Sequence, residues 1–391
     1  MKITKLPCEI VAEILGQLDK VQYLRAPLLS CRLFHDAFTQ RPRLAQQIVR
    51  KQIPKQLLPY AVVLVHASRV NFSNSTYNVL NLTPEDADTL VFSFTFEGDI
   101  VLTSSFPTFS LPQLMTMGTT HELVAEFASQ FAGKAWSAIA DTLNNTIYTK
   151  SMSSHPDLSE KECLRFCRCF YRVELYHGVF TVHNHDEARN VYVTQGNSSL
   201  QLETHLEFGD RLRSRVRMLA DLAPWEIEQL VAAVEYLDSD FKAATTEALA
   251  SDAIRDRPIS TDKWLCKGLA YLRNLKKKSC VEKRGLLDRG TPMFPARFYL
   301  HLRMCHDDRS KALHDTKLDA SLQGPDLSDM DDDEGPRKVL SYIDSSYVLK
   351  FQCKGLRERA YVFWDNERLE QYDIYSAISS RGSFWTSTAH P

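Results

Sequence analysis

The sequence predicts an all-α fold, and three observations carry this prediction. Apolar residues recur at spacings of three and four through most of the chain, which is the period of an amphipathic helix. The chain has 391 residues, of which 44% are hydrophobic and 25% are charged, as is usual for a globular protein with a substantial core. It contains only 14 glycines and no repeat with a period of about 20 to 50 residues, which disfavours propellers and solenoids.

Residues 7–18 form the first predicted helix, because proline suits the first turn of a helix and an apolar pattern follows it. Two adjacent rows of apolar side chains run along this helix, with Ile10 and Ile14 in one row and Val11 and Leu15 in the other. One row can pack against the helices that follow, which leaves part of the other row at the surface. An exposed apolar patch near a chain terminus marks a partner site. The alternative is an ordinary amphipathic helix buried in a single core.

The sequence LPCEIVAEILGQL at 6–18, followed by LLSCRLF at 28–34, resembles the F-box. The F-box is a short helical module through which substrate adaptors dock onto the Skp-type linker protein of a cullin ubiquitin ligase. The resemblance implies a three-helix F-box over residues 1–48. It also implies that the side chains facing the linker are Leu6, Pro7, Ile10, Ile14, Leu15, Leu18, Leu24 and Leu28.

Helical periodicity continues over residues 42–69, where Pro54 and Pro59 are expected to interrupt it. The character of the chain changes over residues 70–120, which are rich in Ser, Thr, Asn and Phe. Within them the alternating run LVFSFTF indicates a half-buried strand. A small hairpin near residues 88–104 and an irregular packed loop both fit this segment.

Helical patterns return after residue 120. The predicted helices are 121–142, 158–180, a pair within 206–237, 262–275, 295–306 and 335–349. Pro224 starts the second helix of the pair, and Asp221 is placed to cap it. We expect these helices to belong to one helical substrate-binding domain over residues 49–390.

An acidic run, residues 324–336, separates the last two predicted helices. It holds five Asp and one Glu and is bounded by Gly-Pro at each end. This composition predicts a disordered, solvated loop, because the segment has little apolar surface to bury. The alternative is a docking site for a basic partner.

The overall composition points to a reducing compartment, cytoplasmic or nuclear. The formal net charge is only −2, so no global field favours nucleic acid or an anionic membrane as partner. The nine cysteines are scattered and odd in number, unlike those of a disulfide scaffold. The N-terminal segment lacks the apolar core of a signal peptide, and the longest apolar stretch, residues 57–65, is too short to span a bilayer.

Cysteine and histidine gather in one region, where Cys163, Cys167 and Cys169 precede His177, His183 and His185. Structural zinc requires a second ligand pair at comparable spacing, and the aromatic helical context of the cysteines favours buried free thiols instead. The chain has no nucleophile elbow, Walker-type loop or dinucleotide fingerprint. We therefore expect no catalytic residue, metal or cofactor.

A second resemblance concerns the C-terminal part. The sequence APWEIEQL at 223–230, paired with YVFWD at 361–365, is similar to filamentous-fungal F-box proteins and implies one helical C-terminal domain. The implied function is that of an adaptor, which binds the Skp-type linker and its cullin at one end and a protein substrate at the other. Tethering would raise the effective concentration of a substrate lysine at a distant active centre. A linker-bound scaffold outside a ligase and a metal-binding enzyme using Cys163–His185 are the alternatives.

Overall fold

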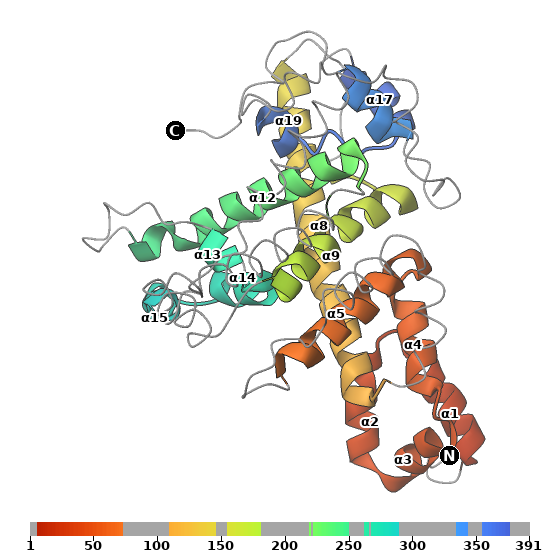
Figure 1. Cartoon of the computed structure of the whole chain (residues 1–391). Coiled ribbons are helices and arrows are strands. Elements are labelled where there is room, and N and C mark those ends of the chain that lie inside the picture. Colours follow the sequence, from red (N-terminus) through yellow and green to blue (C-terminus); the bar gives the residue numbers. More distant parts are fainter. Residues whose placement is uncertain are drawn as a thin grey trace, which may run out of the picture. The chain divides into compact units, whose positions relative to one another are not determined.

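A computed structural model gives the arrangement of the chain (Figure 1). It describes residues 6–72, 109–145, 155–180, 219, 222–249, 262–265, 267–288, 334–342 and 354–375. Helices form all the regular structure in these ranges, and none of the described residues lies in a strand, so the predicted all-α fold is confirmed. The hairpin expected near 88–104 lies outside the described residues.

The chain divides into two compact units, Met1–Ala125 and Glu126–Pro391. The boundary falls within one helix, α8 (Leu111–Asn145), so its residues 111–125 are described with the first unit and the remainder with the second. The F-box boundary expected at residue 48 falls inside the first unit.

Short helices build the first unit. They are α1 (Cys8–Gly16), the 3₁₀ turn η2 (Val21–Leu24), α2 (Arg25–Ser30), α3 (Arg32–Gln40), α4 (Leu44–Gln52), the 3₁₀ turn η3 (Lys55–Leu57) and α5 (Leu58–Phe72). Helix α1 packs on α3 and α4, and α2 packs on α3. The buried side chains at this junction include Val11, Leu15, Ala37 and Ile48, which are at most 2% exposed. The unit therefore has an apolar core of its own.

The two prolines that were expected to interrupt a helix, Pro54 and Pro59, behave differently. Pro54 has extended backbone angles and separates α4 from η3, as expected. The expectation that Pro59 interrupts a helix is wrong, because Pro59 is the second residue of α5. At that position the missing N–H has no partner to lose, so proline starts the helix instead of breaking it.

Residues 111–125 of α8 pack closely on the first helices of this unit. A Cβ on Gly118 would lie 2.7 Å from side-chain atoms of Val21 and of Gln52. The Gln52 amide also ties these segments together, because its oxygen accepts the N–H of Val21 at 3.2 Å and its nitrogen donates to the carbonyl of Gly118 at 3.2 Å. Gly118 thus permits a close helix approach that any other residue would widen.

The second unit combines long helices with short ones. Besides the rest of α8 they are α9 (Glu160–Phe180), α12 (Pro224–Leu249), α13 (Asp262–Leu265), α14 (Gly268–Lys276), α15 (Cys280–Asp288), α17 (Glu334–Tyr342), α19 (Lys354–Glu358) and α20 (Asn366–Gln371). Helix α12 is central, since it packs on α9, α15 and α19, while α14 packs on α9 and α17 on α20. No helix in the described ranges has the length and apolar character needed to cross a membrane.

The helix predicted over 262–275 is interrupted, and its break has a local cause. Gly268 has φ +81°, which belongs to the left-handed region that favours glycine. Gly268 is the first residue of α14, three positions after Leu265, where α13 ends. The predicted helices 295–306 and the first of the pair within 206–237 fall outside the described residues, apart from Leu219.

The end of the acidic run is helical, which corrects the expected loop over residues 324–336. Glu334 to Pro336 form the first turn of α17, where an acidic side chain complements the helix dipole and a proline loses no hydrogen bond. Gly335 lets the start of α17 approach the backbone of residues 364–366. A Cβ at this position would lie 2.5 Å from the carbonyl oxygen of Trp364 and 2.7 Å from the nitrogen of Asn366. Residues 324–333 are outside the described ranges.

Candidate docking surface

Helix α1 is fixed in the first unit by backbone and charged contacts. Pro7 precedes it, and its carbonyl accepts the N–H of Val11 at 3.2 Å. At the other end, the ammonium of Lys51 donates to the carbonyl of Gly16 at 2.9 Å, as the negative end of a helix dipole favours. Arg41 forms an ion pair with Glu13 at 2.5 Å. These contacts hold one face of the helix toward α3 and α4.

The two apolar rows of α1 have different environments. Val11 and Leu15 are 0% and 2% exposed and belong to the core of the first unit. Ile10 and Ile14, in the other row, are 48% and 46% exposed. A β-branched side chain of this size that is half open to water loses the hydrophobic stabilisation that burial gives. The exposed row is therefore the part of α1 that a partner can cover.

The remaining residues that the resemblance assigns to the linker divide by burial. Pro7 is exposed, and Leu6, Leu18 and Leu28 are half-buried. Leu24 is 0% exposed, so its side chain stabilises the unit from inside. Together with the row on α1, the accessible members define a surface of Leu6, Pro7, Ile10, Ile14, Leu18 and Leu28, which we call the α1 surface.

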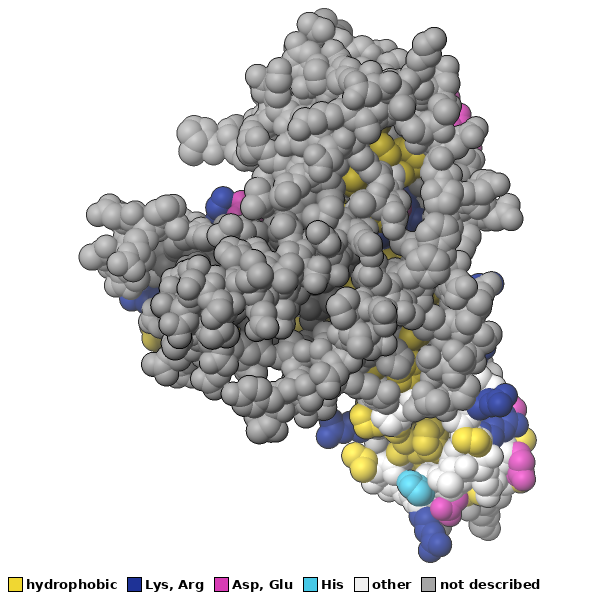
Figure 2. Space-filling view, viewed as in Figure 1, with side chains coloured by type: hydrophobic (Ala, Val, Ile, Leu, Met, Phe, Trp, Pro, Cys, Tyr) yellow, Lys and Arg dark blue, Asp and Glu magenta, His cyan; other side chains and the backbone are white. Residues whose placement is uncertain are grey.

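Sequence reasoning missed two exposed apolar residues in the same unit. Leu29 is 78% exposed and Tyr23 is 52% exposed. Leu29 directly follows Leu28, and two neighbouring residues of a helix cannot point to the same face. The Leu-Leu pair could therefore have indicated that one of the two leucines is exposed. Figure 2 shows hydrophobic side chains open to solvent on the part of the first unit visible in that view.

One stretch of the first unit, residues 6–58, is more basic than the chain as a whole. Residues 6–58 hold eight Lys and Arg against four Asp and Glu, whereas the whole chain is nearly neutral. The exposed basic residues of this stretch are Arg25, Arg32, Arg43, Arg50, Lys51 and Lys55. Exposed positive charge of this kind favours partners that carry complementary negative groups.

The cysteine region of the second unit shows no metal-binding geometry within the described residues. No group of three or more His, Cys, Asp or Glu there could hold a metal ion. Cys169 is buried, and its thiol donates to the carbonyl of Gln229 at 3.2 Å. Cys163 and Cys167 lie one turn apart on α9, while His183 and His185 are outside the described residues.

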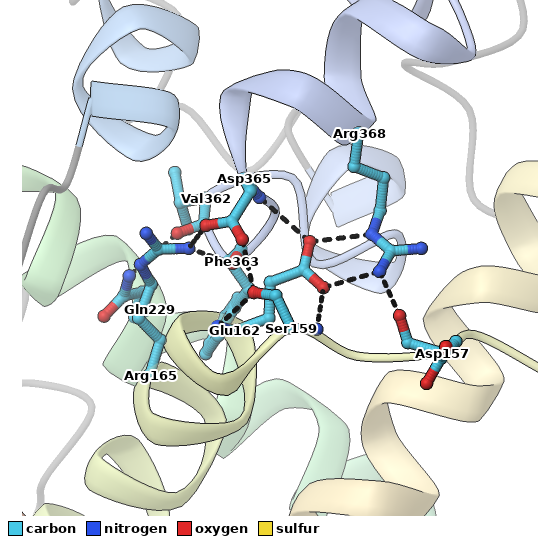
Figure 3. A network of polar contacts seen from close by, with 9 residues as sticks. All are labelled: Asp157, Ser159, Glu162, Arg165, Gln229, Val362, Phe363, Asp365 and Arg368. Carbon is cyan, nitrogen blue, oxygen red and sulfur yellow. Dashed lines mark hydrogen bonds and ion pairs between the residues drawn. The ribbon is translucent and has the colours of Figure 1, made fainter.

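A network of buried charged groups fastens the C-terminal segment to α9 (Figure 3). Glu162 is 0% exposed and accepts two hydrogen bonds from Arg368, both at 2.7 Å. Arg165, also fully buried, donates to Asp365 at 2.7 Å and to the carbonyl of Phe363 at 2.9 Å. Each carboxylate is matched by a guanidinium, which is the arrangement that makes burial of charge tolerable.

The start of α9 joins this network through a capping box. The hydroxyl of Ser159 accepts the N–H of Glu162 at 3.1 Å, and Glu162 accepts the N–H of Ser159 at 3.1 Å. The Ser159 hydroxyl also donates to Asp365, and Arg368 donates to the carbonyl of Asp157. Capping of α9 and attachment of the C-terminal segment are thus one structure.

A second buried network joins the segment to α12. Arg357 donates to both oxygens of Glu228, at 2.9 and 3.0 Å, and to Glu235 at 2.9 Å. Burial lowers the pKa of Arg357, but the two carboxylates outweigh it and raise the pKa above its ordinary value. The amide of Gln229 donates to the carbonyl of Val362 at 2.8 Å. The two stretches that carry the second resemblance, 223–230 and 361–365, therefore pack against each other.

No family model, curated protein or solved structure matches this chain.

Proposed function

We propose that this protein is a substrate adaptor that binds a Skp-type linker through the α1 surface. The observation that supports this most directly is the pair of half-exposed isoleucines, Ile10 and Ile14, on a helix whose opposite row forms the core of a small helical unit. The core of the unit does not need Ile10 and Ile14, because Val11 and Leu15 supply the buried apolar side chains of this helix. An apolar row kept open in this way is suited to a protein partner.

The chemistry of the α1 surface fits a stable protein interface. Such interfaces bury about 1,600 Å² in total, with an apolar centre and a polar rim. Here the isoleucines and Pro7 supply the centre, and Arg41, Lys51 and their neighbours supply polar groups around it. The sequence pattern of residues 6–34 makes a Skp-type linker the partner of choice, and through it a cullin ligase.

The second unit would then hold the substrate. Its aromatic core and paired buried charges make a rigid support, as in Phe166 and Phe363, whose rings stack at 4.3 Å. Adaptor action requires only that a substrate lysine be kept near the ligase active centre, because tethering replaces diffusion. The role needs no acid, base or nucleophile from this chain.

Co-expression with a Skp-type linker, followed by size-exclusion chromatography and titration calorimetry, tests the proposal. The full chain should elute as a one-to-one complex. Ile10→Ala with Ile14→Ala should weaken the affinity by about 1,000-fold, since two central interface residues that each contribute about 2 kcal/mol together contribute about 4 kcal/mol. Leu6→Ala with Pro7→Ala should act in the same direction.

Val281→Ala is the matched control, because Val281 is 77% exposed on α15 of the second unit and lies outside the α1 surface. It should bind the linker as wild type does. Unchanged binding by the Ile10/Ile14 variant, with its helical content intact by circular dichroism, would contradict the assignment of the α1 surface.

A linker-bound scaffold outside a ligase is the second candidate, since the same surface would serve both roles. Reconstitution with the linker, a cullin and a ubiquitin-conjugating enzyme separates the two. Association of the adaptor–linker complex with the cullin and ubiquitin transfer to a bound protein support the ligase role. Linker binding without cullin association would support the scaffold.

A further inference from the structure

A small polar cluster lies where α8, α12 and α14 meet in the second unit. Its centre is Asp240 on α12, whose side chain is 7% exposed. Lys134 of α8 pairs with one oxygen of this carboxylate at 3.2 Å, and Lys276 of α14 pairs with the other oxygen at 2.9 Å. Lys276 also donates to the side-chain oxygen of Gln130 at 3.0 Å. One nearly buried carboxylate is thus shared between two ammonium groups.

Both lysines are open to solvent, yet their ammonium groups are held in place. The side chain of Lys134 is 57% exposed and that of Lys276 is 34% exposed. Each ammonium lies over an aromatic ring, 5.1 Å from the centroid of Tyr236 for Lys134 and 5.6 Å from the centroid of Phe127 for Lys276. The attraction of a cation to the face of a ring adds to the shared ion pair. The two positive charges are therefore positioned before any partner arrives.

The hydroxyl of Tyr236 is a buried donor in the same cluster. Tyr236 is 7% exposed, and its ring stacks on that of Phe131 with 4.7 Å between the centroids. Within the described part of the chain, this hydroxyl is buried and has no hydrogen-bond partner. Burial, followed by the charges of Asp240 and Glu126, raises the pKa of Tyr236, so the phenol keeps its proton. A buried donor of this kind lacks the stabilisation that a bound acceptor would supply.

The charge of the cluster selects an anion. Two lysines face the single carboxylate of Asp240, and the adjacent pair of Arg273 and Glu126, 3.5 Å apart, adds one charge of each sign. The cluster therefore keeps one positive charge in excess. A second carboxylate, which offers two acceptor oxygens, would cancel that charge and accept the hydrogen of the Tyr236 hydroxyl at the same time.

We propose that Tyr236, Lys134 and Lys276, grouped around Asp240, form a binding site for an acidic side chain of a protein partner. The partner's carboxylate accepts hydrogen bonds from the Tyr236 hydroxyl and from the ammonium of Lys134. Lys134 covers the Tyr236 ring, and its exposed side chain can turn to admit the carboxylate. Calling this partner a substrate rests on the proposed function, whereas the site itself does not.

Binding of an acidic peptide to the full chain, without any linker protein, tests the proposal. The probe is a fluorescein-labelled octapeptide of alternating Asp and Gly, followed by fluorescence anisotropy at about 50 mM salt. Wild type should bind it. Tyr236→Phe should weaken the affinity about tenfold or more, since a hydrogen bond to a charged group is lost. The same variant should unfold at the wild-type temperature or above, because the hydroxyl that it removes has no partner in the described ranges.

Two matched controls accompany these variants. Tyr271→Phe removes a hydroxyl on α14 that donates to the carbonyl of Leu286 at 3.4 Å, and it should bind the peptide as wild type does. Lys134→Gln should weaken binding. Lys242→Gln changes a lysine of similar exposure, which pairs with Asp238 on its own helix, and it should leave binding unchanged.

No measurable binding to wild type, or equal affinity of wild type and Tyr236→Phe, overturns the proposal. Loss of binding in Arg43→Ala with Lys55→Ala also overturns it, because the peptide would then occupy the basic stretch of residues 6–58. Linker binding is measured separately. A failed linker complex with intact peptide binding contradicts the proposed function alone, and the reverse result contradicts the acidic-peptide site alone.

Discussion

The side chain of Glu174 is a carboxyl group whose buried position disfavours its charged form. It lies on α9 and accepts the N–H of Leu269, at the start of α14, at 2.6 Å. Burial raises the pKa of this carboxyl to about 7, although the hydrogen bond from Leu269 acts in the opposite direction. Gly268 allows the approach, because a Cβ there would lie 3.0 Å from a Glu174 oxygen.

Replacing Glu174 by glutamine should change how stability depends on pH. The folded pKa of about 7 exceeds the unfolded value of about 4.3, so the native state binds more protons between these values. The contribution of Glu174 to stability should therefore fall as pH rises from about 4.3 to 7 and then level off, so it is measured as the difference between wild type and variant. Glu174→Gln keeps an acceptor for Leu269 and should be more stable than wild type at pH 8, by at most about 4 kcal/mol.

Urea unfolding at about pH 5 and pH 8, followed by tryptophan fluorescence, measures this effect. All five tryptophans fall in residues 126–391, so the signal reports the second unit. Glu162→Gln is the contrasting variant, because it breaks an ion pair with Arg368 and should destabilise at both pH values. If Glu174→Gln has no higher unfolding free energy than wild type at pH 8, the pKa of the Glu174 carboxyl is not raised in the folded state.

Gly335 gives a second prediction at the scale of one residue. Gly335→Ala would bring a Cβ within 2.5 Å of a backbone oxygen, which cannot move aside as a flexible side chain can. We expect a loss of about 2 kcal/mol or more in unfolding free energy. Gly133→Ala is the control, since a Cβ there meets nothing within 4 Å inside α8, and it should stabilise by up to about 1 kcal/mol.

At the scale of elements, the C-terminal segment 354–375 acts as part of the core of the second unit. Its contact with α12 depends on Arg357, which is 5% exposed, and Glu228, which is 1% exposed. Arg357→Met leaves a buried carboxylate without its bidentate partner and should cost about 3–5 kcal/mol. Adding Glu228→Gln removes that uncompensated charge, so the double variant should recover much of the loss.

Thermal unfolding of the two single variants and the double variant forms the cycle that checks this prediction. A coupling energy of several kcal/mol is expected, because the two side chains share hydrogen bonds. If the effects of the single changes simply add, the pair contributes no specific attachment. The segment would then be held by its apolar residues alone.

The elements also show which parts of the fold the sequence could predict. Helix α9 was predicted over 158–180 and spans Glu160–Phe180, because an unbroken apolar period and the Ser159 cap define it locally. Helix α8 starts earlier than the predicted residue 121, and the break at Gly268 was missed. The break depends on contact between α14 and Glu174, which no local pattern contains.

The same division applies to the candidate site. The two rows of α1 were visible as spacing, and the structure places one row inside and the other outside. The pattern could not show that Leu24 is buried or that Leu29 is exposed, because the first depends on how η2 packs on α4 and the second on how α2 packs on α3. The charged networks around Arg165 and Arg357 join residues more than one hundred positions apart, so sequence spacing gave no signal for them.

At the scale of the whole molecule, charge is distributed unevenly between the ends of the sequence. The chain is nearly neutral, yet residues 6–58 carry twice as many basic as acidic side chains. Complementary charge affects the association rate more than the final affinity, and salt screens it with a Debye length of about 10 Å at 0.1 M. A linker that docks on the α1 surface should therefore be steered by its own negative groups.

Stopped-flow association of the full chain with the Skp-type linker tests this last expectation. Raising the salt from about 50 to 500 mM should lower the on-rate by about tenfold or more, with a smaller change in the off-rate. Arg43→Ala with Lys55→Ala, both exposed in the first unit, should lower the on-rate at low salt and flatten the salt dependence. Lys277→Ala with Lys242→Ala, exposed in the second unit, is the matched control. An on-rate that ignores salt would mean that the basic side chains lie away from the docking face, and that the apolar row of α1 alone directs the encounter.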